Sequence, residues 1–155
     1  MAVGVGDAAP PFELEGFFEG ERRPYSLSEF AGQPIVLVLY PGDDTPVCTR
    51  QLNSYTDDLG QFEEVGAQIL AVSPQDLDSH EQFSCKHELG FPLLADTDKS
   101  LFDDYGALGP LGFPRRSVFV IDGEGVIRYA HRALAGVTFR KSDELVDAVR
   151  SATGG

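Results

Sequence analysis

The 155-residue sequence has few basic side chains, few cysteines and no long apolar run, and each shortage excludes a class of protein. Lys and Arg number 12 against 25 Asp and Glu, and the formal net charge of -13 would repel nucleic-acid phosphates and anionic lipid. No apolar run approaches the roughly 18 residues that a membrane helix needs. The amino terminus lacks a basic stretch followed by an apolar core. We therefore expect a soluble protein in the cytoplasm.

The two cysteines, Cys48 and Cys85, are too few for a framework of structural disulfides. In a reducing compartment such thiols are more often catalytic than structural. A metal site is not expected, because the sequence has no C-x-x-C or H-x-x-x-H pair. On a helix, His80 and His87 would lie two turns apart while Cys85 points the other way.

The pattern of apolar segments predicts one α/β domain over residues 1–155. Ile35–Leu39 is a short aliphatic run, typical of a strand buried on both faces, and Gln68–Val72 is a second such strand. A helix is predicted between them, from near Thr45 or Pro46 to near Gly66. A strand-helix-strand unit places the residues after the first strand at the carboxyl edge of a sheet, where open α/β sheets carry their sites.

Further elements follow from periodicity and from cap and turn residues. They are a strand around Phe12–Leu14, a turn-rich link, a short helix at Leu27–Phe30 capped by Ser26 or Ser28, a helix at Ser79–Leu89 with a serine cap and a Gly90 stop, a strand at Phe91–Ala95, a short helix at Ser100–Tyr105 capped by Asp98, a hairpin of Ser117–Ile121 and Val126–Ala130, and an amphipathic helix at Ser142–Ala152 that buries Leu145, Val146 and Val149.

Cys48 is predicted in the first turn of the helix that follows the first buried strand. Unpaired N–H groups and the positive end of the helix dipole favour an anion at this place, and a thiolate is such an anion. The competing interpretation is that Cys48 is a small buried apolar residue, the usual fate of a free cysteine. The residues alone favour the two interpretations about equally.

Pro41, Thr45 and Cys48 form the pattern P-x-x-x-T-x-x-C, and the segment YPGDDTPVCTRQL resembles the active-site segment of the peroxiredoxins. The likeness is greatest to the bacterioferritin comigratory protein (PrxQ) branch. It extends over nearly the whole chain, since VGDAAPPFEL, SLSEFAGQPIVLVLYP, FPLLADTD and RSVFVIDGEGVIRYAH occur in the order that this family shows. The resemblance implies a thioredoxin-like fold, a central mixed β-sheet flanked by helices, and a monomer.

The resemblance also implies a role for each residue of the site, in the reduction of hydrogen peroxide or an alkyl hydroperoxide without metal, flavin or haem. Arg116 is favoured over Arg115, because the family arginine lies three residues before a phenylalanine, here Phe119. The implied roles are Cys48 as the peroxidatic thiolate, Thr45 as a hydroxyl that binds the peroxide, Pro41 as a shield over the sulfur, Arg116 as the guanidinium that holds the thiolate and the O–O bond, Gln51 as a brace for that arginine, and Tyr40 as a supporting residue.

Cys85 is predicted to face outward, because it lies about 200° around its helix from Phe83. Its position resembles that of the resolving cysteine in one subgroup of the PrxQ branch, whereas the commoner position, five residues after the nucleophile, is Asn53 here. The resemblance then implies a disulfide of Cys48 with Cys85 that thioredoxin or a similar dithiol reduces. We expect the first turn of the Cys48 helix to unwind for it, and the Ser79–Leu89 helix to loosen.

Three alternatives remain open at this point. The protein could be a one-cysteine peroxiredoxin that an external thiol resolves, with Cys85 a bystander. A thioredoxin-type oxidoreductase is disfavoured, because Thr45 stands where the first cysteine of C-x-x-C would be. The last alternative is a non-catalytic interaction domain that has the fold without the chemistry.

Overall fold

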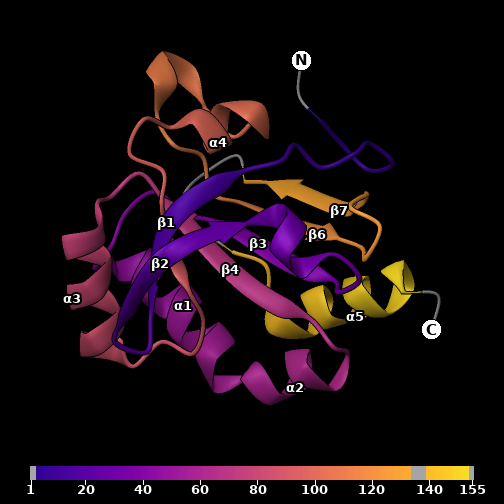
Figure 1. Ribbon diagram of the computed structural model, residues 1–155, viewed down its shortest axis with the longest axis horizontal. Helices are drawn as coiled ribbons and strands as arrows, with labels where there is room; N and C mark the ends of the chain where they lie inside the picture. Colours follow the sequence, from indigo (N-terminus) through magenta and orange to yellow (C-terminus); the bar gives the residue numbers. More distant parts are fainter. Residues whose placement is uncertain (1–2, 134–138, 154–155) are drawn as a thin grey trace.

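The computed structural model describes residues 3–133 and 139–153, and its centre is a mixed sheet of seven strands (Figure 1). The strand order is β2-β1-β5-β4-β3-β6-β7. The pairs β3–β4 and β4–β5 are parallel and the other four pairs are antiparallel. The strands are β1 Glu13–Phe18, β2 Glu21–Ser26, β3 Ile35–Leu39, β4 Gln68–Ser73, β5 Leu93–Ala95, β6 Ser117–Ile121 and β7 Ile127–Arg132.

Helices cover both faces of the sheet (Figure 1). On one face, buried side chains of α1, α2, α3 and α5 share a core with β3 and β4. On the other face, Leu101 and Phe102 of α4 form a second core, against which the short 3-10 helix η1 packs. The helices are η1 Leu27–Phe30, α1 Pro46–Asp57, α2 Leu59–Glu64, α3 Leu77–His87, α4 Ser100–Asp104, the 3-10 helix η2 Pro110–Gly112 and α5 Ser142–Ala152.

Strand β3 has the residues and the burial predicted for it. Val36 and Val38 enter one core, and Ile35, Leu37 and Leu39 enter the other, so the alternation of a strand supplies both faces. Its neighbours are β4 on one side and β6 on the other. This central place explains why the run is aliphatic throughout, and it fixes where the chain leaves the sheet toward α1.

The helix after β3 begins at Pro46 as predicted, but it is not continuous to Gly66. At Asp58 the backbone leaves the helical range (φ -98°, ψ 15°), so that α1 ends there and α2 begins at Leu59. Thr45 occupies the N-cap position without making a cap hydrogen bond. Its hydroxyl donates instead to the Gly42 carbonyl at 3.1 Å, within the preceding loop.

Helix α3 corrects the boundaries predicted for Ser79–Leu89. Asp76 caps it, since its Oδ1 accepts the Ser79 N–H at 2.9 Å, so the predicted serine cap is wrong. The helix ends at His87, two residues earlier than predicted, because Glu88 takes a left-handed conformation (φ 50°). Asp76, three residues before Ser79, accepts a hydrogen bond from the first turn of α3, so the Ser79 side chain is not needed as a cap.

The largest error of the sequence-based prediction is in the amino-terminal segment, where a full hairpin replaces the expected link. Strands β1 and β2 pair antiparallel around Glu19 and Gly20, which both have positive φ, as a two-residue type I′ turn requires. Pro24 and the charged residues before it are atypical of a strand, so the pattern did not predict β2. Because β2 is the edge strand, it tolerates a proline. Neither predicted serine cap forms, since Ser26 is the N-cap of η1 without a side-chain hydrogen bond.

The later elements agree more closely with the prediction. The hairpin of β6 and β7 forms, α5 has the predicted ends, and its three predicted apolar residues are buried. The N-cap of α4 is Lys99, without a side-chain cap hydrogen bond, so the predicted Asp98 cap is wrong, although Asp98 Oδ1 accepts the Ser100 N–H at 3.0 Å. Strand β5 is shorter than the predicted strand. Among the residues described, no helix is long and apolar enough to cross a membrane.

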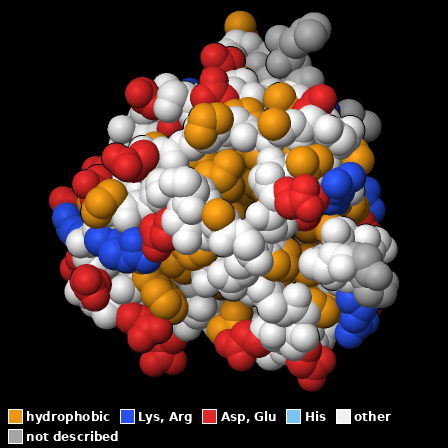
Figure 2. All heavy atoms as spheres, turned by 45° about the vertical axis from the view of Figure 1, so that its right-hand side comes forward, with side chains coloured by type: hydrophobic (Ala, Val, Ile, Leu, Met, Phe, Trp, Pro, Cys, Tyr) orange, Lys and Arg blue, Asp and Glu red, His pale blue; other side chains and the backbone are white. Residues whose placement is uncertain are grey.

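On the face seen in Figure 2, acidic side chains are more frequent than Lys and Arg, which form only separate small groups, and hydrophobic side chains gather in the middle of the view. The net charge of -13 is thus spread over the exposed faces of several elements. Such a surface favours solubility and repels polyanions.

The α5 contact with the sheet yields a prediction on stability. Leu145→Ala should lower the free energy of unfolding by about 2–5 kcal/mol, because Leu145 is fully buried and its loss leaves a cavity. Urea unfolding followed by circular dichroism measures it. Asp147→Ala, at an exposed position of the same helix, is the control and should change the value by less than about 0.5 kcal/mol. Equal effects would contradict the packing described.

Candidate active site

Cys48 and Arg116 meet where β3 ends and β6 begins. Leu39, the last residue of β3, pairs with Ser117, the first residue of β6, so Arg116 lies beside the chain that leads into α1. Cys48 is in the first turn of α1 and only 1% exposed, and Arg116 is 5% exposed. The Arg116 Nη2 donates to Cys48 Sγ at 3.2 Å. A guanidinium donor is thus fixed against a buried sulfur.

Gln51 and Tyr55 extend this contact along the buried side of α1. The Arg116 Nη1 donates to Gln51 Oε1, and the Gln51 amide donates to the Tyr55 hydroxyl at 3.3 Å. Tyr55 in turn donates to the Arg140 carbonyl at 2.6 Å. Burial is the main reason why the pKa of Tyr55 rises to about 12, so that its phenol remains a donor. The Arg116–Gln51 contact is present, and the role of Gln51 as a brace stays a prediction.

Sequence reasoning missed Tyr55, although a signal was available. Residues 48, 51 and 55 are spaced by three and four, the spacing that places side chains on one face of a helix. The structure brings Arg116, and not Arg115, against Cys48. Arg115 donates through Nε to the Ala133 carbonyl at 2.7 Å.

The loop from Tyr40 to Thr45 carries the remaining predicted residues. Tyr40 is fully buried and donates to Asp43 Oδ1 at 2.6 Å. Burial, followed by the charge of Asp43, raises the pKa of Tyr40 well above its usual value, so this phenol stays protonated. Pro41 is half-buried and Thr45 is exposed at the N-cap of α1. The loop thus lies beside Cys48 in the chain, held by its own hydrogen bonds.

Asp43 is a second residue that sequence reasoning missed, since it was treated as turn chemistry together with Asp44. Its Oδ2 accepts from Ser79 Oγ at 2.7 Å and lies 2.7 Å from His80 Nδ1. The Asp43 side chain is 3% exposed and that of His80 is 0% exposed. The available signal was that His80 shares a helix face with Phe83, which packs into the core.

Cys85 lies on the exposed side of α3 and Phe83 on the buried side, so the predicted outward orientation is confirmed. Both cysteines are free thiols in this structure. In the described parts of the chain, no three His, Cys, Asp or Glu side chains are placed to hold one metal ion.

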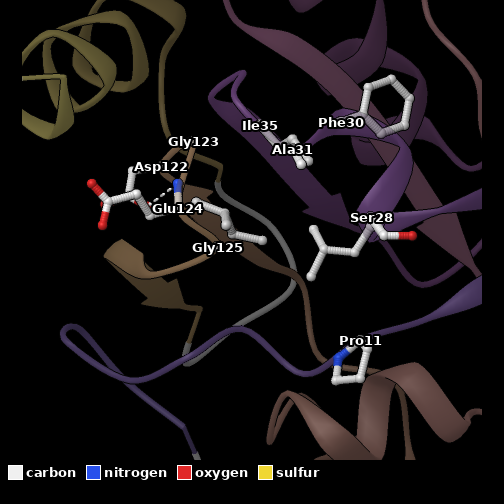
Figure 3. Close-up of a pocket in the computed structure, with 11 residues that line it drawn as sticks. Pro11, Ser28, Phe30, Ala31, Ile35, Asp122, Gly123, Glu124 and Gly125 are labelled. Atoms are coloured by element: carbon white, nitrogen blue, oxygen red, sulfur yellow. Dashed lines mark hydrogen bonds between the residues drawn. The ribbon is translucent and has the colours of Figure 1, made fainter.

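A mostly apolar hollow lies at the opposite end of the sheet and is separate from this site (Figure 3). Ile35, the first residue of β3, and Ile121, the last of β6, line it together with the turn that leads into β7. In Figure 3 that turn is held by the Asp122 carboxylate, which accepts the Glu124 N–H at 2.9 Å. The thiol and the guanidinium stand at the other end of the same two strands.

Comparison with known proteins agrees with this geometry. The sequence model of the AhpC/TSA family matches residues 5–130. The chain belongs to the AhpC/TSA family. Within it, the chain is 36% identical over 131 residues to peroxiredoxin Q, chloroplastic, of Oryza sativa subsp. japonica, covering 83% of this chain and 59% of that protein. It is 35% identical to peroxiredoxin Q, chloroplastic, of Sedum lineare, with 83% and 69% covered. The predicted resemblance to the peroxiredoxins is thus confirmed.

The chain spans 59% of the length of the rice relative. That relative is named a chloroplastic protein, and the expected cytoplasmic location of this chain stays a prediction. Solved structures of the AhpC/TSA family agree in fold. Mycobacterium tuberculosis AhpC superposes with a TM-score of 0.88 at 25% identity, with 99% of each chain covered. The reduced 2-Cys peroxiredoxin of Plasmodium vivax has a TM-score of 0.90 at 24% identity, with 97% and 82% covered. The thioredoxin-like fold predicted from the resemblance is confirmed.

The raised pKa of Tyr55 predicts how stability changes in alkali. In the unfolded chain a tyrosine loses its proton near pH 10, whereas folded Tyr55 keeps it to about 12, so the free energy of unfolding falls with pH between these values. The Tyr55→Phe variant has no phenol at this position, so it lacks this part of the fall in the free energy of unfolding. By pH 11 the wild type should have lost about 1.4 kcal/mol more than the variant, relative to pH 8. Urea unfolding at both pH values measures this, and an unchanged difference would contradict it.

Proposed function

We propose that the protein is a thiol-dependent peroxidase that reduces hydrogen peroxide and alkyl hydroperoxides at Cys48. The observation that carries the proposal is the 3.2 Å contact between Arg116 Nη2 and Cys48 Sγ in a site closed to water. A thiolate is the nucleophilic form of cysteine, and a guanidinium already fixed at the sulfur can stabilise charge that develops there without side-chain movement during the reaction. Membership of the AhpC/TSA family supports the same chemistry.

In the first step the Cys48 thiolate attacks one oxygen of the peroxide, and the O–O bond breaks. Cys48 becomes a sulfenic acid, and with one proton the other oxygen leaves as water or an alcohol. Arg116 can stabilise the negative charge that develops on the leaving oxygen, since it is already directed at the reacting sulfur. Thr45 and the Cys48 N–H are proposed as further donors to the peroxide, and Pro41 as a cover over the sulfur.

In the second step the Cys85 thiol condenses with the sulfenic acid, forming a Cys48–Cys85 disulfide and releasing water. Thioredoxin or a similar dithiol then reduces the disulfide by exchange. We propose that the whole cycle takes place within one monomer and one domain. The exposure of Cys85 supports its role, because a thiol on the surface of α3 can reach both a displaced Cys48 and an external reductant.

The second step needs movement, because Cys48 is buried and Cys85 is exposed. A disulfide requires Cα atoms within about 7 Å of each other. We propose that the first turn of α1 unwinds after oxidation and that α3 loosens. The missing cap hydrogen bond at Thr45 supports this, since a helix end without a side-chain cap is easier to open.

A thiol count tests the proposed cycle. Fully reduced protein receives one equivalent of hydrogen peroxide, is quenched within seconds and denatured, and its free thiols are counted beside a non-reducing gel. Loss of both thiols with a monomer band is expected, because condensation consumes Cys48 and Cys85 together. Cys85→Ser should lose its single thiol and Cys48→Ser should lose none.

Other outcomes of this count have defined meanings. Loss of one thiol in the wild type would overturn the role of Cys85 and favour resolution by an external thiol. An unchanged count in the wild type would overturn the peroxidase itself and favour a non-catalytic domain.

The contact of Arg116 with sulfur predicts a large kinetic effect. In a Cys85→Ser background, Arg116→Met should lower the second-order rate constant for oxidation of Cys48 by about 100-fold, as removal of one preorganised donor does elsewhere. Stopped-flow mixing with hydrogen peroxide measures it. Arg115→Met is the matched control, because Arg115 donates to the Ala133 carbonyl and should leave the rate constant unchanged. Similar losses in both variants would contradict a specific role for Arg116.

A further inference from the structure

Two successive acidic residues of the loop before α1 bind helix α3, one in the interior and one on the surface. Asp43 meets Ser79 and His80 in the first half of α3. Asp44 meets Lys86 at 3.0 Å and His87 at 3.4 Å near the end of the same helix. The loop that leads into Cys48 is therefore joined to the helix that carries Cys85 at two places of very different character.

In the interior contact, each ring nitrogen of His80 faces one acceptor. The Leu94 carbonyl lies 2.9 Å from His80 Nε2 and can only accept, so this nitrogen carries a proton. The other nitrogen, Nδ1, faces the Asp43 carboxylate, which also accepts when it is ionised. Both ring nitrogens of His80 therefore have a partner in the interior. Because these groups are out of water, the loss of His80 would remove one of the donors that compensate the buried Asp43 carboxylate.

The Asp43 carboxylate has three side-chain partners in all. Tyr40 donates to Oδ1, and Ser79 and His80 are on Oδ2. One of these partners comes from the end of β3 and two come from α3. The carboxylate thus fixes the middle of the loop against both the end of β3 and the helix α3. This loop precedes Cys48 in the chain, whereas Arg116 follows it.

The surface contact offers a natural comparison. The Asp44 side chain is 53% exposed and that of Lys86 is 61% exposed, and such pairs contribute little because water and salt screen them. The two neighbouring carboxylates therefore have the same charge and the same helix as partner, but only Asp43 is held in the interior.

We propose that Asp43 and His80 are positioning residues of the peroxidase site, which hold the loop of residues 41–45 in place for peroxide attack and delay its opening toward Cys85. The proposal rests on the proposed function. It assigns the pair two effects of opposite sign: the contact favours oxidation of Cys48, and it opposes the movement that lets Cys48 and Cys85 join. Neither residue touches the reacting sulfur.

Two substitutions of His80 separate this role from mere packing. The amide nitrogen of His80→Asn stands near the place of Nδ1 and can still donate to Asp43. That of His80→Gln stands near the place of Nε2 and donates to the Leu94 carbonyl instead. Both variants lose the ring, but only His80→Gln removes the contact of residue 80 with Asp43, while the Ser79 contact with the same carboxylate remains in both. Urea unfolding of both checks that they are folded and comparably stable.

The rate of each step is then measured in stopped-flow mixing with hydrogen peroxide. In a Cys85→Ser background, His80→Gln should lower the rate constant for Cys48 oxidation by about tenfold, as a small displacement of a positioned group does. With Cys85 present, disulfide formation should become faster. His80→Asn should stay near the parent in both steps. Asp44→Asn should leave Cys48 oxidation unchanged.

Amide hydrogen exchange of the peptide over residues 41–48 reads the loop directly and needs no peroxide. The rate of exchange should be higher in His80→Gln than in the parent, whereas in His80→Asn it should be close to that of the parent. Equal exchange in the two variants, or slower rates in both chemical steps alike, would overturn the proposal. If exchange differs as expected while the parent loses no thiol to peroxide, the contact with the loop stands and the peroxidase function fails.

Discussion

A buried guanidinium opposite a buried sulfur is the constraint on which the site depends. A charge removed from water must be met by acceptors or by an opposite charge, because its desolvation is otherwise too costly. Arg116 is held in the interior by contacts that include Cys48 and Gln51, both from α1. The strand register places Arg116, and the turns of α1 place the two acceptors. An error of one residue in either element would leave a positive charge facing apolar side chains.

The two sides of Cys48 are held by different means. On the helix side, hydrogen bonds run from Arg116 through Gln51 to Tyr55 and end on a backbone carbonyl. Gln51 and Tyr55 belong to α1, and Arg116 directly precedes β6. On the loop side, the backbone is irregular and is fixed by the carboxylate of Asp43 against α3. A rigid helix side supports the electrostatics of the thiolate, and a loop side held by one buried group can be released.

The sequence predicted the parts of the fold that depend on local pattern. The aliphatic run of β3, the proline that opens α1 and the amphipathic spacing of α5 each specify their element without reference to distant residues. The contact of Arg116 with Cys48 followed only from family resemblance, because 68 residues separate the two in the chain. Strand β2 was missed since its proline and charges are tolerated only at a sheet edge, and edge position is a property of the whole sheet.

The Asp43–His80 contact was missed for a related reason, since a carboxylate in a turn and a histidine on a helix each have common local roles and 37 residues separate them in the chain. Their joint burial suggests where movement begins. Tyr55 ties the third turn of α1 to the Arg140 carbonyl, and Gln51 ties the second to Arg116. In the first turn, the Arg116 guanidinium contacts the Cys48 sulfur, which is the atom that reacts, and the Thr45 hydroxyl is bound to Gly42 within the loop. If the loop is released from α3, unwinding can proceed through Cys48 and stop at Gln51, which leaves the core of α1 in place while the sulfur moves outward.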